Sequence, residues 1–100
     1  MVLTILEAHV PPGQEAALQA AYEVAIAKPR PRGLVRSELL RDVVDATRWR
    51  IQTLWESRAA LDAMRAAGGT PQGVLMFRAA SAEPELTIFD VVDTLVDRAP

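Results

Sequence analysis

The chain has 100 residues and a formal net charge of −2, and half of its residues are hydrophobic. This length fits one small domain. The lack of a basic excess argues against a general nucleic-acid binder. The absence of cysteine excludes disulfides, thiolate nucleophiles and zinc–cysteine sites. No apolar run approaches the roughly 20 residues that span a bilayer, and the apolar start lacks the basic region of a signal peptide, so we expect a soluble cytoplasmic protein without a membrane partner.

The first half of the chain predicts two strands with a helix between them. Residues 2–10 are typical of a strand, which Pro11, Pro12 and Gly13 end. Residues 14–27 predict a helix whose apolar face is formed by Leu18, Ala21, Tyr22, Ala25 and Ile26 at helical spacing. Two prolines, at 29 and 31, stop this helix, because proline lacks a backbone donor and disfavours helical conformation in the preceding residue. Residues 34–41 then predict a second strand.

The second half predicts a hairpin, two helices and a last strand. The polar turn 42–47 joins the second strand to a third at 49–55. That strand runs almost directly into a helix at 59–67, with Ser57 as its N-cap. Gly68 and Gly69 end the helix. Thr70 as N-cap and Pro71 as first helical residue predict a short helix over 72–80, and 85–96 predicts the last strand.

The predicted order is β-α-β-β-α-α-β, in which the second of the two consecutive helices, at 72–80, is short. This order predicts an α+β fold of the ferredoxin-like βαββαβ type. In this fold two main helices cover one face of a four-stranded antiparallel sheet. We expect residues 1–97 to form a single domain and residues 98–100 to be a C-terminal tail.

The first and last strands are apolar on both faces. Helices cover only one face of the sheet, so the apolar side chains on the other face remain uncovered. We therefore expect a second copy of the sheet to pack against the open face, giving a homodimer. The alternative is a monomer with an apolar sheet face.

Three segments resemble the antibiotic biosynthesis monooxygenase (ABM) domain family: LLRD at 39–42, TRWR at 47–50 and TLWESRAAL at 53–61. The turn at Pro12 and Gly13 and the closing FDVV at 89–92 also fit, so that the resemblance covers nearly the whole chain. The LWES segment is its most specific part. The resemblance implies a dimeric α+β barrel, in which two ferredoxin-like sheets pack face to face.

Members of that family include cofactor-independent oxygenases of aromatic polyketides, quinol oxygenases and haem-degrading enzymes, with a pocket between sheet and helices. The asparagine, tryptophan and histidine of the haem-degrading group would fall at Leu6, Met64 and near Val74. None of them matches, and the chain contains no asparagine. The resemblance therefore extends neither to haem degradation nor to the polyketide oxygenases that rely on an asparagine.

Residue alternation predicts which side chains line such a pocket. With Leu6 on the helix side, the lining is apolar and aromatic with a few hydroxyls, and it suits a flat hydrophobic or aromatic ligand. The substrate-pocket candidates are Thr4, Leu6, Trp49, Thr53, Met64 and Phe77. Tyr22 is a candidate catalytic residue that could donate a hydrogen bond to a substrate oxygen. The alternative is that these side chains only fill the core.

His9 is the second catalytic candidate, because it is the only histidine and has an ordinary pKa near neutrality. Alternation places it with Glu7 on the side away from the helices, where Arg50 and Gln52 also lie. A polar Glu–His–Arg cluster inside the dimer is one interpretation. The other is that the strand end twists and directs His9 into the pocket.

These features predict a monooxygenase that needs no bound metal or cofactor, because a deprotonated electron-rich substrate can itself reduce O₂ when the protein orients and desolvates it. The substrate class is a small aromatic, polyketide or quinol-type molecule. A non-catalytic ligand-binding or accessory domain with the same fold is the alternative, and an isomerase is a third interpretation.

Overall fold

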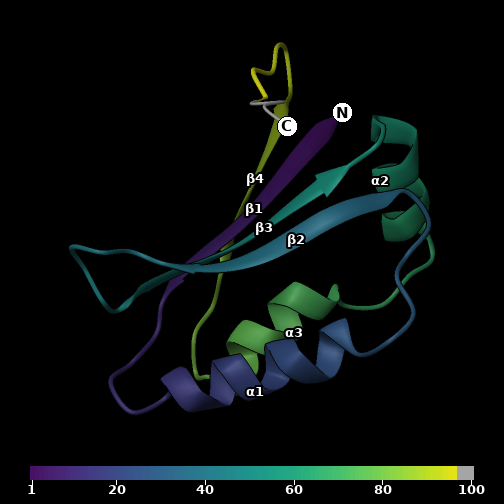
Figure 1. Ribbon diagram of the computed structural model, residues 1–100. Coiled ribbons are helices and arrows are strands. Elements are labelled where there is room, and N and C mark those ends of the chain that lie inside the picture. Colours follow the sequence, from purple (N-terminus) through teal and green to yellow (C-terminus); the bar gives the residue numbers. More distant parts are fainter. Residues whose placement is uncertain (97–100) are drawn as a thin grey trace.

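A computed structural model of the chain describes residues 1–96, which form an antiparallel sheet with helices on one face (Figure 1). Within these residues the strand order is β2-β3-β1-β4, which confirms the ferredoxin-like fold. The elements are β1 (Val2–His9), α1 (Glu15–Ile26), β2 (Leu34–Arg41), β3 (Arg48–Trp55), α2 (Arg58–Ala66), α3 (Gln72–Ala79) and β4 (Glu85–Asp90). The predicted tail at 98–100 lies outside the described residues.

The sheet register fixes which side chains face the helices. β1 lies between β3 and β4, with Thr4 opposite Thr53 on one side and Ile88 on the other. Side chains alternate across a strand, and the buried Val2 and Ala8 therefore place the even-numbered residues of β1 on the helix side. The odd-numbered residues lie on the other side, which we call the open face.

Side chains between sheet and helices form two hydrophobic clusters. The main core joins α1 and α3 to the sheet and includes the fully buried Leu18 and Phe77. The small core lies under α2 and contains Val2, Trp55 and Leu61.

The start of α2 is fixed by two local contacts. Ser57 Oγ accepts a hydrogen bond from the backbone N–H of Ala60 at 3.1 Å, which confirms the predicted N-cap. The Gly33 carbonyl accepts from the N–H of Glu56 at 2.9 Å. A β-carbon at Gly33 would overlap Ala60, and Gly33 has a positive φ of 85°, so this close approach of the β2 start to α2 requires glycine.

Three predicted details are wrong. The last strand ends at Asp90 rather than at 96, because its neighbour β1 begins at Val2 and offers no partner beyond the bond from Val91 N to Met1 O at 3.0 Å. Thr70 does not cap α3, because the helix starts one residue later, with Pro71 at the N-cap position and no side-chain cap bond. Ile26, expected on the buried face of α1, is exposed.

None of the helices within residues 1–96 is both long enough and apolar enough to cross a membrane.

Candidate functional site

Hydroxyl side chains form a row across the helix-covered face of the sheet. Thr4 on β1, Thr53 on β3 and Ser37 on β2 stand side by side in the strand register. The Tyr22 phenol on α1 donates to Ser37 Oγ at 2.9 Å, and Thr53 Oγ1 donates to the same atom at 3.3 Å. The Trp55 indole Nε1 donates to Thr4 Oγ1 at 3.2 Å. We call Thr4, Thr53, Ser37 and Tyr22 the hydroxyl row.

The hydroxyl row lies between the two hydrophobic clusters. Tyr22 belongs to the main core, whereas Trp55, which contacts the other end of the row, belongs to the small core. The three sheet hydroxyls are half-buried, so they keep partial contact with solvent. Because Ser37 Oγ accepts two hydrogen bonds, its own proton remains available for a further acceptor. The arrangement can therefore bind an oxygen atom of a ligand beside apolar surfaces.

The structure distributes the predicted pocket residues over both clusters. Trp49 and Phe77 are buried in the main core with Tyr22, and Leu6 packs against them. Met64 instead packs against the small core. These side chains contact one another within each cluster, so the apolar lining predicted from alternation is present as packed side chains on the helix face.

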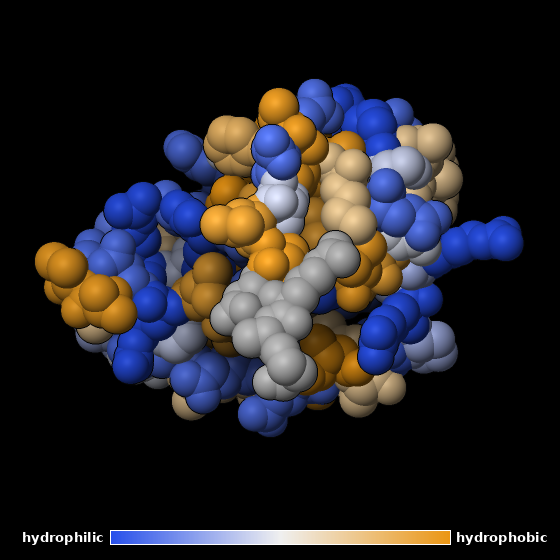
Figure 2. Space-filling model, turned by 45° about the horizontal axis from the view of Figure 1, so that its top comes forward, coloured by the Kyte–Doolittle hydropathy of each residue, from blue (hydrophilic) through white to orange (hydrophobic). Residues whose placement is uncertain are grey.

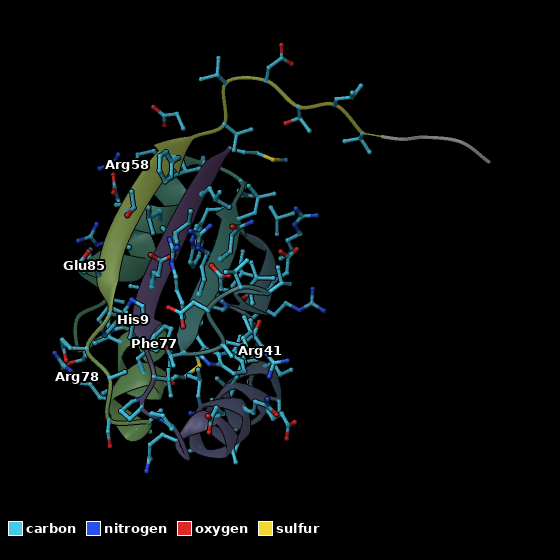
Figure 3. The ribbon with its side chains drawn as sticks, turned by 90° about the vertical axis from the view of Figure 1, so that its left-hand side faces the viewer. His9, Arg41, Arg58, Phe77, Arg78 and Glu85 are labelled. Carbon is cyan, nitrogen blue, oxygen red and sulfur yellow. The ribbon has the colours of Figure 1, made fainter. Side chains whose placement is uncertain are left out.

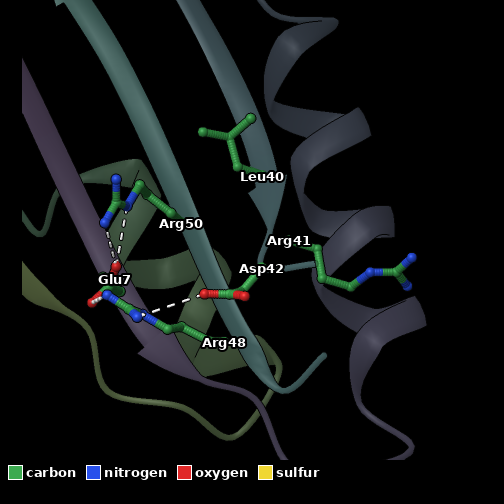
Figure 4. Close-up of a pocket in the computed structure, with 6 residues that line it drawn as sticks. All are labelled: Glu7, Leu40, Arg41, Asp42, Arg48 and Arg50. Carbon is green, nitrogen blue, oxygen red and sulfur yellow. Dashed lines mark hydrogen bonds and ion pairs between the residues drawn. The ribbon is translucent and has the colours of Figure 1, made fainter. Parts of the chain in front are cut away.

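The Trp49 indole is the one buried side chain in residues 1–96 whose polar atom has no hydrogen-bond partner. Its Nε1–H faces no acceptor in that part of the chain, although buried donors normally have one. The Arg41 guanidinium lies over the ring, 5.6 Å from its centroid, and Figure 4 shows this side chain on the α1 side of the sheet. The Trp49 Nε1–H is thus a buried donor without a partner among the described residues, on the same face of the sheet as the hydroxyl row.

The open face carries a network of ion pairs (Figure 4). Arg50 Nη2 donates to Glu7 Oε1 at 2.7 Å, and Arg48 Nη2 donates to Glu7 Oε2 at 3.1 Å. Asp42 Oδ2 lies 3.6 Å from Arg48 Nη1. The hydrogen bonds from Arg50 and Arg48 hold the pKa of the Glu7 carboxyl below its ordinary value. Opposite charges are already paired here, which indicates a structural network rather than a site for a free ion.

Two cavities open beside this network. The first has a volume of about 270 Å³ and is lined by Glu7, Leu40, Arg41, Asp42, Arg48 and Arg50. The second has a volume of about 190 Å³ and is lined by Ile5, Glu7, Arg50, Glu85, Thr87 and Phe89. Both are on the open face, on the opposite side of the sheet from the hydroxyl row.

His9 lies at the end of β1 and does not join the Glu7 network. Its Nδ1 is 3.1 Å from Thr47 Oγ1 and 3.5 Å from Asp45 Oδ2, and its side chain is 69% exposed. The predicted Glu–His–Arg cluster is therefore wrong in its membership, because Arg48 takes the place beside Glu7 that was expected for His9. Figure 3 shows His9 on β1 and Phe77 on α3, with Arg41 across the sheet from His9.

Sequence reasoning missed Ser37, which joins Tyr22 to the sheet. The signal was available, because Ser37 shares the alternation of Leu39 and therefore faces the helices. Arg48 shares the alternation of Arg50 and therefore lies on the open face, but its bond to Glu7 depends on the register between β1 and β3. Residues 1–96 contain no group of three His, Asp or Glu side chains able to hold a metal ion.

Residues 1–69 match the family model described as antibiotic biosynthesis monooxygenase. No curated protein sequence matches the chain. Many solved structures share the fold, among them three with 16–20% sequence identity. A candidate antibiotic biosynthesis monooxygenase from Deinococcus radiodurans has a TM-score of 0.76 and 16% identity, over 99% of this chain and 100% of that one.

The second structure is a variant of SnoaB from Streptomyces nogalater, which is described as a cofactor-independent oxygenase. It has a TM-score of 0.73 and 20% identity over 96% of this chain and 97% of that one. The third, Rv0793 from Mycobacterium tuberculosis, has a TM-score of 0.67 and 18% identity over 96% and 100% of the two chains. The similarity in each case is one of fold along almost the full length.

Proposed function

The chain belongs to the antibiotic biosynthesis monooxygenase family, and on this premise we propose that it is a cofactor-independent monooxygenase. Its substrate is a small aromatic, polyketide or quinol-type molecule bound between the sheet and the helices. The description of SnoaB as a cofactor-independent oxygenase supports this reaction class for the fold.

The observation that carries the proposal is the hydroxyl row. Tyr22 and Thr53 both donate to Ser37 on the helix face of the sheet, beside buried aromatic side chains. A phenolate or enolate oxygen bound there would accept the free proton of Ser37, or that of Tyr22 once the phenol turns from Ser37 to the substrate. A second substrate oxygen could accept from Trp49 Nε1. Donors of this kind stabilise the negative charge of the deprotonated substrate.

The chemistry requires the protein to hold and desolvate the substrate. The deprotonated substrate passes an electron to O₂, and the two radicals combine into a carbon-bound peroxide. The O–O bond of this peroxide then breaks as the remaining proton on the same carbon is lost, which leaves a carbonyl on the substrate. One oxygen atom enters the substrate and the other leaves as water, with the substrate supplying the electrons. Tyr22 is the proposed catalytic residue because its phenol can donate to the substrate oxygen. Thr4, Leu6, Trp49, Thr53, Met64 and Phe77 are the proposed lining.

The proposed assembly is a homodimer in which two open faces pack together. Phe89 and Leu40 are exposed on that face although both are large and apolar. The Glu7 network lies between them, and its charges are already paired, so that a second sheet could cover it without leaving a carboxylate alone. Face-to-face packing would close the α+β barrel.

A non-catalytic ligand-binding domain is the second candidate. What favours it is the absence of three residues that the family resemblance implies for haem-degrading relatives. Their asparagine, tryptophan and histidine would fall at Leu6, Met64 and near Val74, and none of them matches.

Oxygen consumption separates the two candidates. Purified metal-free protein is tested against a panel of anthrones, quinols and catechols, with heat-denatured protein as the control for spontaneous oxidation. Saturable, protein-dependent uptake supports the monooxygenase. Binding of a panel member with no uptake above the control supports the binding domain.

A further inference from the structure

Gly73, the second residue of α3, lies directly against the helix-covered face of the sheet. A β-carbon at this position would lie 2.5 Å from Leu6 Cδ1 on β1 and 3.9 Å from Ile51 Cδ1 on β3. The first distance is shorter than a packed β-carbon tolerates, so any larger residue at 73 would displace the end of the Leu6 side chain. Figure 1 shows α3 beside α1 on the helix side of the sheet.

The glycine at 73 is required for space and not for backbone conformation. The other four glycines of the chain have a positive φ, whereas Gly73 has none and lies within a helix. After proline, glycine is the least favourable residue inside a helix, so helix propensity alone would favour alanine here. What alanine would take away is the room that the Leu6 side chain occupies beneath α3.

Leu6 lies between the hydroxyl row and the main core. It follows Thr4 by two residues on the same face of β1, about 6.6 Å along the strand. It packs against the main core but stays half-buried. In the strand register Leu6 is opposite Ile51, as Thr4 is opposite Thr53. The Leu6 side chain is therefore the apolar boundary of the space above Thr4 and Thr53.

The neighbours of Leu6 determine where a displaced side chain goes. Ala8 and Ile51 are both buried in the main core and close two sides. On the third side Leu86 stands opposite Leu6 on β4, with a side chain of the same size. Thr4 is smaller, half-buried and further away, so we expect the displaced methyl group to move toward the hydroxyl row.

We propose that Gly73 is a positioning residue that limits the size of the substrate. By leaving room for Leu6 beneath α3, it keeps that side chain away from the hydroxyl row and leaves the space above the row open. This inference rests on the proposed function, because it concerns the same site. Its consequence is selective: a methyl group at 73 excludes the larger members of the substrate class more strongly than the smaller ones.

Binding in the absence of oxygen tests this proposal separately from the reaction. Calorimetry under argon measures the dissociation constants of anthrone, which has three rings, and of hydroquinone, which has one. A single methyl group in a fitted apolar site changes discrimination by roughly 10–200-fold. We therefore expect Gly73→Ala to raise the ratio of the anthrone to the hydroquinone dissociation constant by at least about tenfold.

Rescue identifies Leu6 as the side chain through which Gly73 acts. Combining Gly73→Ala with Leu6→Ala gives the space back and should abolish the rise in the ratio. The matched control combines Gly73→Ala with Leu86→Ala, which removes the same atoms from a side chain that is not among the nearest neighbours of position 73. This control should leave the rise unchanged. Leu86 is 47% exposed, and exposed apolar side chains are ordinary on this molecule, as Figure 2 shows for one face.

A second measurement follows the Leu6 side chain itself. In Gly73→Ala, methyl NMR should show a contact between the Leu6 and Thr4 methyl groups that is stronger than in the unmodified chain. The urea midpoint should stay close to that of the unmodified chain, because alanine favours the helix and only the end of a flexible side chain has to move.

Three results would overturn the proposal. An equal rise in both dissociation constants would show a structural role only. Rescue by Leu86→Ala as complete as that by Leu6→Ala would show that the effect does not pass through Leu6. A Gly73→Ala chain that fails to fold would show that the Leu6 side chain cannot yield.

Failure of the proposed function gives a different pattern. If the dissociation constants change as expected but no oxygen is consumed in air, the size limit stands and the monooxygenase is rejected. If oxygen is consumed but the ratio does not change in Gly73→Ala, the monooxygenase stands and the size limit is rejected. If the unmodified chain binds neither ligand, both proposals are rejected.

Discussion

The phenol of Tyr22 on α1 donates a hydrogen bond to Ser37 Oγ on β2 at 2.9 Å. This bond crosses from the helix layer to the sheet, next to the junction of the two hydrophobic clusters. It places a polar donor where neighbouring side chains are apolar or aromatic. The proposed oxygenase reaction depends on this pair more than on any charged group, because the charged network lies on the other face.

Replacing Tyr22 by phenylalanine should reduce kcat for the oxygenase substrate by at least about tenfold, because it removes a donor to the substrate oxygen. The free energy of unfolding should fall by only about 1 kcal/mol, the usual value of one hydrogen bond. Steady-state oxygen uptake and urea denaturation measure the two effects.

His9→Ala provides the contrast, since His9 contacts the hairpin residues Thr47 and Asp45 rather than the hydroxyl row. We expect its kcat to equal that of the unmodified chain. If His9→Ala abolished turnover with fold and dimer retained while Tyr22→Phe did not, the assignment of the active face would be reversed.

Glu7→Gln removes the carboxylate that two arginines share on the open face. About a third of the Glu7 side chain is exposed, so solvent screens the pairs and the expected loss of unfolding free energy is roughly 0.5–1 kcal/mol. Urea denaturation at pH 7 measures it.

The matched control is Glu83→Gln, whose partner Arg78 forms a single exposed pair (Figure 3). This change should reduce stability less than Glu7→Gln does. An equal or larger loss at Glu83 would show that the Glu7 network adds nothing beyond an ordinary surface pair.

The same carboxylate makes stability depend on pH. Hydrogen bonds from Arg50 and Arg48 keep the pKa of Glu7 below its ordinary value in the folded chain, whereas in the unfolded chain it returns to about 4.3. At a pH between the folded and the unfolded pKa, the unfolded chain binds more protons than the folded chain. The contribution of Glu7 to the free energy of unfolding is therefore fully present above about pH 5 and is lost as the pH falls through the folded pKa.

Urea midpoints between pH 7 and pH 3 test this sign. The difference between the unmodified chain and Glu7→Gln should shrink as the pH falls below about 5. Lowered pKa values are also found at Asp42, Asp45 and Glu83. The stability of the Glu7→Gln variant therefore still depends on pH, but less than that of the unmodified chain. A difference that stays constant down to pH 3 would contradict the assignment to Glu7.

Ser57→Ala and Thr70→Ala test the two predicted helix caps. Ser57 Oγ accepts from Ala60 N, so its loss should cost about 1 kcal/mol of unfolding free energy. Thr70 makes no cap bond to α3, so Thr70→Ala should leave the thermal and urea midpoints unchanged. Equal effects of the two substitutions would refute the cap assignment.

Local sequence rules predicted the elements well because each is encoded by nearby residues. The β2 bounds and the Ser57 cap follow from proline, glycine and alternation within a few positions. The end of β4 does not, because 91–96 continues the apolar strand pattern while pairing depends on where β1 begins. The cap at Thr70 also failed, since Pro71 is extended rather than helical and moves the helix start away from it.

The candidate site was predictable in part. Alternation placed Thr4, Thr53 and Trp49 on the helix face, and helical spacing placed Tyr22 toward them. The bond from Tyr22 to Ser37 required knowing which strand α1 crosses, and the pairing of Arg48 with Glu7 required the register of strands 41 positions apart in the chain. Both are long-range facts that no local pattern contains. The homodimer stays a prediction.

The most direct test of the oxygenase proposal is the fate of oxygen atoms from ¹⁸O₂. The protein is incubated under ¹⁸O₂ with the panel of anthrones and quinols, and the products are examined by mass spectrometry beside heat-denatured controls. We expect a product that carries one ¹⁸O atom, formed in proportion to active protein and strongly reduced by Tyr22→Phe. A panel that yields no protein-dependent ¹⁸O product, with a member bound at the hydroxyl row, would contradict the oxygenase and leave a binding domain.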